Sequence, residues 1–206
     1  MSQFTITNQS NQEGCLEGYL ELILGPMFSG KTSELIQIYN NYNYIDKNVI
    51  VINYAKDTRY HDSMLSTHDR KMIPCILTMD INDMWENSSN KNYKDLREAD
   101  VILINEGQFF KNLKECVIDM VENKNKIVYI CGLDGDFKRE KFGELLDLIP
   151  YCDKVNKLTS LCSKCKNGKK GIFSCRITNE ESQIVIGSDN YKPLCRNCYS
   201  NETIHT

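Results

Sequence analysis

One eight-residue motif constrains the fold of this chain more than any other feature of its sequence. It matches the pattern G-x-x-x-x-G-K-[ST], and its residues are Gly25, Pro26, Met27, Phe28, Ser29, Gly30, Lys31 and Thr32. The glycines let consecutive backbone N–H groups point at phosphate oxygens, and a helix that begins at the loop adds its positive end. Lys31 would reach the outer phosphates, and the Thr32 hydroxyl would ligate magnesium. The motif therefore predicts a strand, a phosphate loop and a helix in succession, the alternative being a chance match.

The residues before and after the motif have the patterns of a strand and of a helix. Residues 19–24 resemble a strand, and Leu35, Ile38, Tyr42 and Ile45 recur at helical spacing. Further strands are predicted at 48–54, 100–104 and 126–130, and helices at 110–124, at 140–148 and within 80–98. The run at 48–54 is β-branched without alternation, which is typical of a strand buried on both faces. Strands alternating with helices predict an α/β fold with a mainly parallel sheet flanked by helices.

An acidic residue follows one of these strands. Residues 100–104 run into Asn105, Glu106, Gly107 and Gln108. Ligands of open α/β sheets gather at the carboxyl ends of the strands, so Glu106 is expected in the same crevice as Lys31. A carboxylate there could take a proton from an attacking hydroxyl. The alternative is a solvated carboxylate without a role.

The cysteines are unusually numerous, ten in 206 residues, and four of them form two pairs. The pairs are Cys162-x2-Cys165 and Cys195-x2-Cys198, and two such turns can close a tetrahedron around Zn²⁺. Four thiolates leave no open position, so the metal is expected to be structural. Two disulfides or free thiols are the alternatives, disfavoured because residues 1–18 lack a secretory apolar run and no segment resembles a membrane span. We therefore expect a reducing, cytoplasmic location.

Composition changes along the chain indicate its organisation. We expect a flexible tail at 1–17, a phosphate-binding α/β domain at 18–152, a zinc-binding unit at 153–199 and a tail at 200–206. The formal charge of −3 disfavours a non-specific nucleic-acid coat protein, which would present a basic face.

Seven segments together resemble a known family. They are LILGPMFSGKTSELI at 22–36, AKDTRY at 55–60, STHD at 66–69, EGQFF at 106–110, GLDGDF at 132–137, KLTSLCSKC at 157–165 and PLCRNCY at 193–199. In this order they resemble the type II thymidine kinases of animal cells, many bacteria and large DNA viruses. The resemblance implies a P-loop (RecA-like) domain with a small C-terminal zinc-ribbon or lasso domain. It further implies phosphoryl transfer from ATP to the 5′-hydroxyl of thymidine with Mg²⁺, structural Zn²⁺, a homotetramer and feedback inhibition by dTTP.

The resemblance also implies roles for individual residues. Glu106 matches the general base, residues 25–32 match the ATP loop, and Asp57, Arg59 and Gln108 match polar groups around the phosphates. The apolar walls of the nucleoside site match Phe109, Leu133 and Phe137, with Met27 beneath the base. Tyr191 matches a residue of the lasso-like loop that closes over thymidine. Residues 182–187, including Ile184, Val185, Ile186 and Gly187, match the part whose backbone hydrogen-bonds the thymine edge. Cys162, Cys165, Cys195 and Cys198 match the zinc ligands.

Two residues and one longer stretch depart from the family pattern. Asn105 stands where Asp precedes the base, which predicts weaker Mg²⁺ binding or a lower rate. Ser174 stands where Thr lies near the thymine 5-position, and one methyl fewer is worth roughly 1 kcal/mol of selectivity. The stretch at 166–171 is longer than usual. The competing hypothesis is a zinc-ribbon module fused to an ATPase that acts on nucleic acid or protein.

Overall fold

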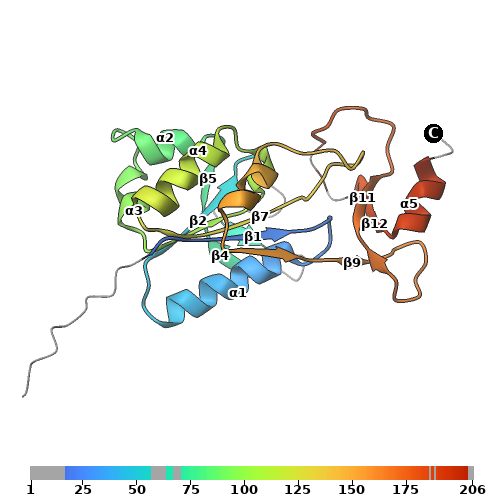
Figure 1. Cartoon of the computed structure of the whole chain (residues 1–206), viewed down its shortest axis with the longest axis horizontal. Helices are drawn as coiled ribbons and strands as arrows, with labels where there is room; N and C mark the ends of the chain where they lie inside the picture. Colours follow the sequence, from blue (N-terminus) through green and yellow to red (C-terminus); the bar gives the residue numbers. More distant parts are fainter. Residues whose placement is uncertain (1–16, 57–63, 67–70, 186, 188, 204–206) are drawn as a thin grey trace, which may run out of the picture.

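The computed structural model describes residues 17–56, 64–66, 71–185, 187 and 189–203. Its centre is a six-stranded sheet with the order β5-β2-β6-β7-β1-β8, in which every pairing is parallel. The strands are β1 (Tyr19–Leu24), β2 (Val49–Tyr54), β5 (Ile76–Thr78), β6 (Val101–Ile104), β7 (Ile127–Gly132) and β8 (Lys154–Lys157). The predicted parallel α/β sheet is confirmed. Figure 1 shows α1 on one face of it and α2, α3 and α4 on the other.

Two apolar cores separate these helices from the sheet. Leu20, Leu22 and Leu24 of β1 belong to the core beneath α2 (Ile81–Glu86), α3 (Tyr93–Glu98) and α4 (Leu113–Ile118). Ile23 faces the other core, which α1 (Lys31–Tyr44) covers with Leu35. All four residues of β6 are fully buried, which explains why the sequence of the central strands does not alternate.

Two predicted helices differ from the structure. The predicted helix 110–124 is α4 followed by a π-helical segment, η2 (Asp119–Asn123). The predicted helix 140–148 is instead a 3₁₀ helix, η3 (Leu145–Tyr151). Gly143 has a φ of 60°. A left-handed residue interrupts a right-handed helix, so the helix begins only after this position. The short η1 (Gly107–Phe109) follows β6.

The remaining strands form small antiparallel pairs. β3 (Met64–Ser66) pairs with β4 (Met72–Pro74), β9 (Ser160–Leu161) with β10 (Lys170–Gly171), and β11 (Phe173–Arg176) with β12 (Tyr191–Leu194). The last two pairs and α5 (Arg196–Thr203) form the C-terminal part in Figure 1. β8 lies within the predicted unit 153–199 but joins the main sheet through β1. The boundary at 152 stays a prediction.

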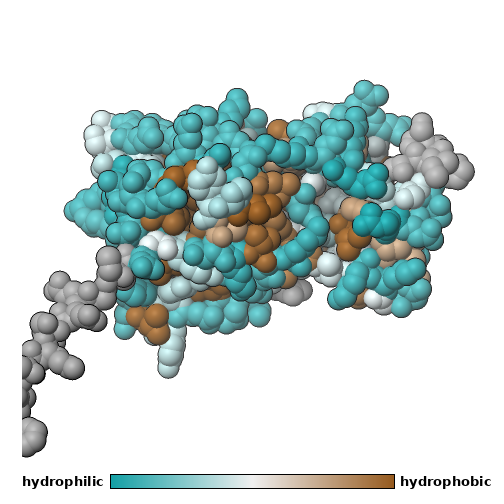
Figure 2. All heavy atoms as spheres, viewed as in Figure 1, coloured by the Kyte–Doolittle hydropathy of each residue, from teal (hydrophilic) through white to brown (hydrophobic). Residues whose placement is uncertain are grey.

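The surface of the molecule is largely polar. Figure 2 shows a mostly hydrophilic face, on which brown side chains gather over the middle of the α/β part and over a smaller area of the C-terminal part. Within the described ranges, no helix is both long and apolar enough to span a bilayer.

Candidate active site

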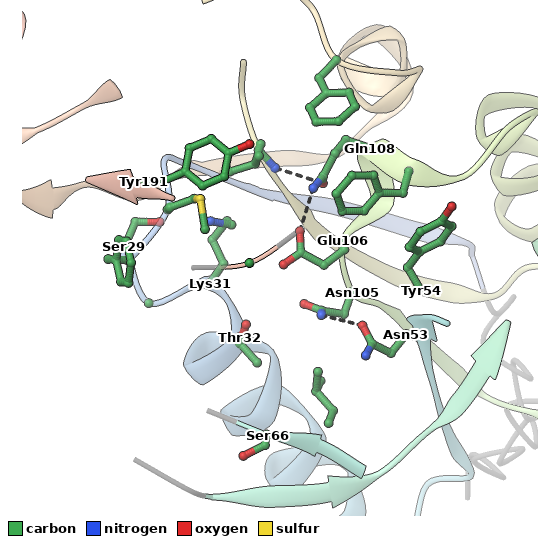
Figure 3. Close-up of a pocket in the computed structure, with 18 of the residues that line it drawn as sticks. Ser29, Lys31, Thr32, Asn53, Tyr54, Ser66, Asn105, Glu106, Gln108 and Tyr191 are labelled. Atoms are coloured by element: carbon green, nitrogen blue, oxygen red, sulfur yellow. Dashed lines mark hydrogen bonds between the residues drawn. The ribbon is translucent and has the colours of Figure 1, made fainter. Parts of the chain in front are cut away.

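A cavity of about 410 Å³ lies where the phosphate loop meets the ends of the central strands. The loop side of the lining is Met27, Phe28, Ser29, Gly30, Lys31, Thr32 and Ser33. The strand ends and the segments after them supply Asn53, Tyr54, Asn105, Glu106, Gln108, Phe109, Leu133 and Phe142. Residues 64–66 add one wall, and the segment before β12 adds Gln183, Ile184, Val185, Gly187 and Tyr191. Figure 3 shows Lys31, Glu106 and Tyr191 gathered around this space.

The phosphate loop has the backbone that its motif predicts. Gly30 adopts a φ of 88° immediately before α1, a conformation that glycine adopts without steric cost. Lys31 is buried, and its Nζ donates to the Pro26 carbonyl oxygen at 2.8 Å. The buried Ser29 Oγ has no hydrogen-bond partner among the described residues. A cationic side chain and a buried hydroxyl at the start of a helix are suited to phosphate oxygens.

Glu106 occupies the turn between β6 and η1. Its φ of 55° and ψ of 43° are left-handed, a conformation that costs a non-glycine residue about 1–3 kcal/mol and is often found at functional sites. Gln108 Nε2 donates to Glu106 Oε2 at 2.6 Å, and Gln108 Oε1 accepts the N–H of Leu133 at 3.1 Å. Gln108 is 2% exposed. The carboxylate is therefore oriented by an amide that is itself held by the backbone after β7.

Asn105 lies beside the site in a buried polar chain. Its Nδ2 donates to Asn53 Oδ1 at 2.8 Å, and its Oδ1 accepts the Cys131 thiol at 2.8 Å. Both asparagines and the cysteine are buried. This chain ties the ends of β2, β6 and β7 together directly before Glu106.

Aromatic rings form the apolar wall. Tyr54 and Phe109 are stacked with their centroids 4.9 Å apart, and Phe142 meets Phe109 edge-on at 5.3 Å. Leu133 and Met27 line the same cavity. A flat, apolar wall beside a phosphate loop suits a ligand that carries both a planar base and a phosphate.

Some sequence-predicted site residues are not part of this lining. Ser174 is buried and accepts the Met27 N–H, while the Phe137 ring packs 3.7 Å from the Arg176 guanidinium. Gly25 is held against Leu158, whose carbonyl oxygen would lie 2.7 Å from an added Cβ. Asp57, Arg59 and Ile186 lie outside the described residues.

The four paired cysteines meet in space. Their sulfur atoms all lie within 4.8 Å of one another, with separations of 3.3 Å for Cys165–Cys198 and 3.7 Å for Cys165–Cys195. Burial opposes ionisation of Cys162, but the backbone N–H groups of Cys165, Cys195 and Lys164 outweigh it and lower the pKa of this thiol to about 6. Zn–S bonds of about 2.3 Å in a tetrahedron put sulfurs about 3.8 Å apart, so the cluster fits zinc.

Comparison with known proteins decides the family. The family model described as thymidine kinase matches residues 18–199, which span both the cavity and the cysteine cluster. This chain belongs to the thymidine kinase family. The resemblance carried by the seven segments is thereby confirmed.

Individual thymidine kinases are similar over most of their length. The thymidine kinase of sheeppox virus is 40% identical over 183 residues, which cover 88% of this chain and 97% of the relative. Thymidine kinase 1 of Dictyostelium discoideum is 36% identical, covering 91% of this chain and 80% of the relative. The cytosolic thymidine kinase of Bos taurus is 37% identical, covering 88% and 72%.

Several residues that line the cavity were not predicted from the sequence. Asn53 and Tyr54 end β2, so the rule that identified Glu106 at a strand end applies to them too. Phe142 and residues 64–66 could not be predicted in this way, because they do not directly follow a strand of the central sheet, yet they line the cavity. Gln183 was expected only through the backbone of its segment, yet its side chain reaches Asp136 Oδ2 at 2.8 Å.

Proposed function

We propose that this chain transfers the γ-phosphoryl group of ATP to the 5′-hydroxyl of thymidine, giving dTMP. The decisive observation is that the phosphate loop, Glu106 and the aromatic wall line one cavity in a chain that belongs to the thymidine kinase family. A donor phosphate and an acceptor nucleoside could therefore meet there. Phosphoryl transfer depends mainly on such positioning and on charge neutralisation.

The phosphate loop would bind ATP. We propose that its N–H groups, the Ser29 and Thr32 hydroxyls and Lys31 contact the phosphates, with Lys31 Nζ leaving the Pro26 carbonyl. Asp57 and Arg59 are proposed to contribute to the same phosphate site. Mg²⁺, when bound, would neutralise the phosphate charge, and Thr32 and Asn105 are its proposed neighbours. Asn105 offers an uncharged amide oxygen, already in contact with the Cys131 thiol.

Glu106 is the proposed general base. Its carboxylate would accept the 5′-hydroxyl proton as the oxygen attacks the γ-phosphorus, a contribution of typically about 10²–10⁴-fold. The bond from Gln108 holds the carboxylate in one orientation. We therefore assign Gln108 to Glu106 rather than to a phosphate.

Thymidine would lie against the aromatic wall. We propose that Phe109, Leu133 and Met27 contact the nucleoside, joined by Tyr54 and Phe142, and that Phe137 and Ser174 support this wall from behind. The backbone of Ile184, Val185, Ile186 and Gly187 would meet the thymine edge, and Tyr191 would cover it. Closure by this segment excludes water, which would otherwise compete as acceptor.

Zinc would act in the fold and not in the reaction. Cys162, Cys165, Cys195 and Cys198 would hold it where β9, β12 and α5 converge. We propose the division into an α/β domain at 18–152 and a zinc unit at 153–199, with tails at 1–17 and 200–206. A homotetramer and inhibition by dTTP are proposed from the resemblance, and a cytoplasmic location also from the name of the bovine relative.

A transfer assay tests the proposed function. Purified protein is incubated with labelled ATP, Mg²⁺ and each nucleoside, and labelled dTMP is the expected product. A zinc-ribbon ATPase acting on nucleic acid is the competing function, which family membership does not favour. Transfer to no nucleoside, together with ATP hydrolysis stimulated by DNA, would favour that competitor.

A further inference from the structure

The side chain of Arg176, the last residue of β11, binds carbonyl oxygens of the backbone that follows this strand. Its Nη1 donates to the carbonyl oxygens of Glu180, at 2.8 Å, and of Ser182. Its Nη2 donates to the carbonyl oxygen of Gln183 at 3.1 Å and to the Tyr191 hydroxyl oxygen at 2.6 Å. One guanidinium thus joins three peptide groups of residues 180–185, here called the covering segment, to the first residue of β12.

The face of the same guanidinium is also fixed. Its carbon lies 3.7 Å from the centroid of the Phe137 ring, within the range of a cation–π contact. The Phe137 carbonyl oxygen in turn accepts the hydroxyl of Tyr199 in α5. Arg176 is therefore stacked on a residue that is tied to the cysteine-containing part of the chain.

The covering segment depends on side chains for its shape. Among the described residues, no backbone–backbone hydrogen bond involves positions 180–185. Besides Arg176, the Tyr191 hydroxyl donates to the Val185 carbonyl oxygen at 3.1 Å, and Gln183 Nε2 donates to Asp136 Oδ2 at 2.8 Å. Figure 1 shows the connection between β11 and β12 arching away from the strands that it joins. An irregular segment that is held by side chains and not by backbone–backbone hydrogen bonds has low local stability.

Arg176 does not line the cavity, whereas Gln183, Ile184, Val185 and Tyr191 do. Each Nη carries two hydrogens, and both nitrogens already have two protein acceptors. The guanidinium has no remaining Nη donor for a phosphate. Its Nε is buried and has no hydrogen-bond partner among the described residues, but no atom of Arg176 lines the cavity. Its influence on a ligand therefore passes through the covering segment.

We propose that Arg176 is a positioning residue, which holds the covering segment in the shape that forms the acceptor side of the cavity. This proposal rests on the proposed function, since it assigns that side to the nucleoside. Losing Arg176 lowers the fraction of molecules whose segment is correctly shaped, and the apparent affinity for the acceptor falls by that fraction. ATP binding through the phosphate loop is affected little.

The test compares Arg176→Ala, Arg176→Lys and a matched control, Arg97→Lys. Arg97 is also stacked, 3.9 Å from the Trp85 ring, and also donates to a carbonyl oxygen, but it belongs to α3. We expect KM for thymidine to rise at least about 10-fold in Arg176→Ala and less in Arg176→Lys, with KM for ATP within about 2-fold. The control should behave as the wild type, and all variants should retain their zinc content.

Limited proteolysis provides a second readout that does not require turnover. A glutamate-specific protease cleaves after Glu180 and Glu181, which lie in the covering segment. Cleavage there should be at least about 10-fold faster in Arg176→Ala, while the Arg97→Lys control is cut at the wild-type rate. Unchanged cleavage and unchanged KM for thymidine would overturn the proposal. An equal rise in both KM values with loss of zinc would also overturn it, since that indicates general unfolding. If the wild type transfers phosphate to no nucleoside, the proposed function fails, whereas the proteolysis measurement still decides what Arg176 does.

Discussion

The backbone N–H of Met27 donates to Ser174 Oγ at 2.9 Å. Met27 belongs to the phosphate loop and Ser174 to β11, so this bond joins the proposed ATP site to the strand that carries Arg176. Ser174 was expected at the thymine 5-position, but its hydroxyl is engaged with the loop backbone. The proposed ATP loop and the strand behind the proposed nucleoside wall are therefore joined by a direct hydrogen bond.

Ser174→Ala should weaken both substrate sites together. Removing the acceptor leaves the Met27 N–H unpaired at a site that is largely buried, a cost of about 1–2 kcal/mol. We expect kcat/KM to fall about 5- to 30-fold for ATP and thymidine alike, measured by steady-state kinetics. Ser174→Thr keeps the hydroxyl and should retain activity, while Ser200→Ala in α5, whose hydroxyl donates only within its own helix to the Arg196 carbonyl oxygen, is the control. A loss confined to thymidine would contradict the shared bond and favour direct contact with the base.

Glu106→Gln should abolish proton abstraction without disturbing the loop. Turnover should fall at least about 10²-fold while ATP still binds, as measured by rapid-quench kinetics and calorimetry. The exposed Glu115→Gln on α4 is the matched control and should leave turnover unchanged. Near-normal turnover of Glu106→Gln would remove Glu106 as the base.

Gln108→Glu should lower the rate by displacing the base. It places a carboxylate where Gln108 Nε2 now donates to Glu106 Oε2 at 2.6 Å, so an attraction becomes a repulsion. Glu106 is then no longer held in one orientation, and kcat should fall about 10-fold or more, as measured by steady-state kinetics. A kcat equal to that of the wild type would show that Gln108 does not orient Glu106.

Asn105→Asp should reduce the Mg²⁺ concentration needed for half-maximal rate, because a carboxylate binds hydrated Mg²⁺ better than an amide does. The change also removes the donor to Asn53 Oδ1 and buries a charge, so the free energy of unfolding should fall by about 1–3 kcal/mol. Magnesium titrations and urea unfolding measure the two effects, with the exposed Asn112→Asp as control. An unchanged magnesium requirement would contradict the proposal that Asn105 lies next to the bound Mg²⁺.

Cys165→Ser should prevent zinc binding, because it removes one of the four proposed ligands. We expect elemental analysis to find about one zinc per wild-type chain and a small fraction of that in the variant, with a lower melting temperature. Cys152→Ser is the control, since Cys152 lies outside the cluster of four. Full zinc content in Cys165→Ser would exclude it as a ligand.

Much of the fold followed from local patterns. Residues 19–24 and 31–44 were predictable because a phosphate loop requires a strand before it and a helix after it, and the structure has both. The parallel sheet followed from β-branched runs without alternation. The edge strand β8 was missed because Lys154–Lys157 is polar and mostly exposed, so only its pairing with β1 identifies it as a strand.

The sequence by itself determined the ligand chemistry: a phosphate loop, a carboxylate at a strand end and four cysteines in two pairs. These signals are local, because each motif is contained in a short stretch of the chain. The tertiary structure alone decided that Gln108 orients Glu106, that Ser174 binds the Met27 backbone, and that Arg176 holds the covering segment. Such contacts depend on where distant segments pack and which rotamers fit there, and residue type and spacing do not encode that in any short stretch.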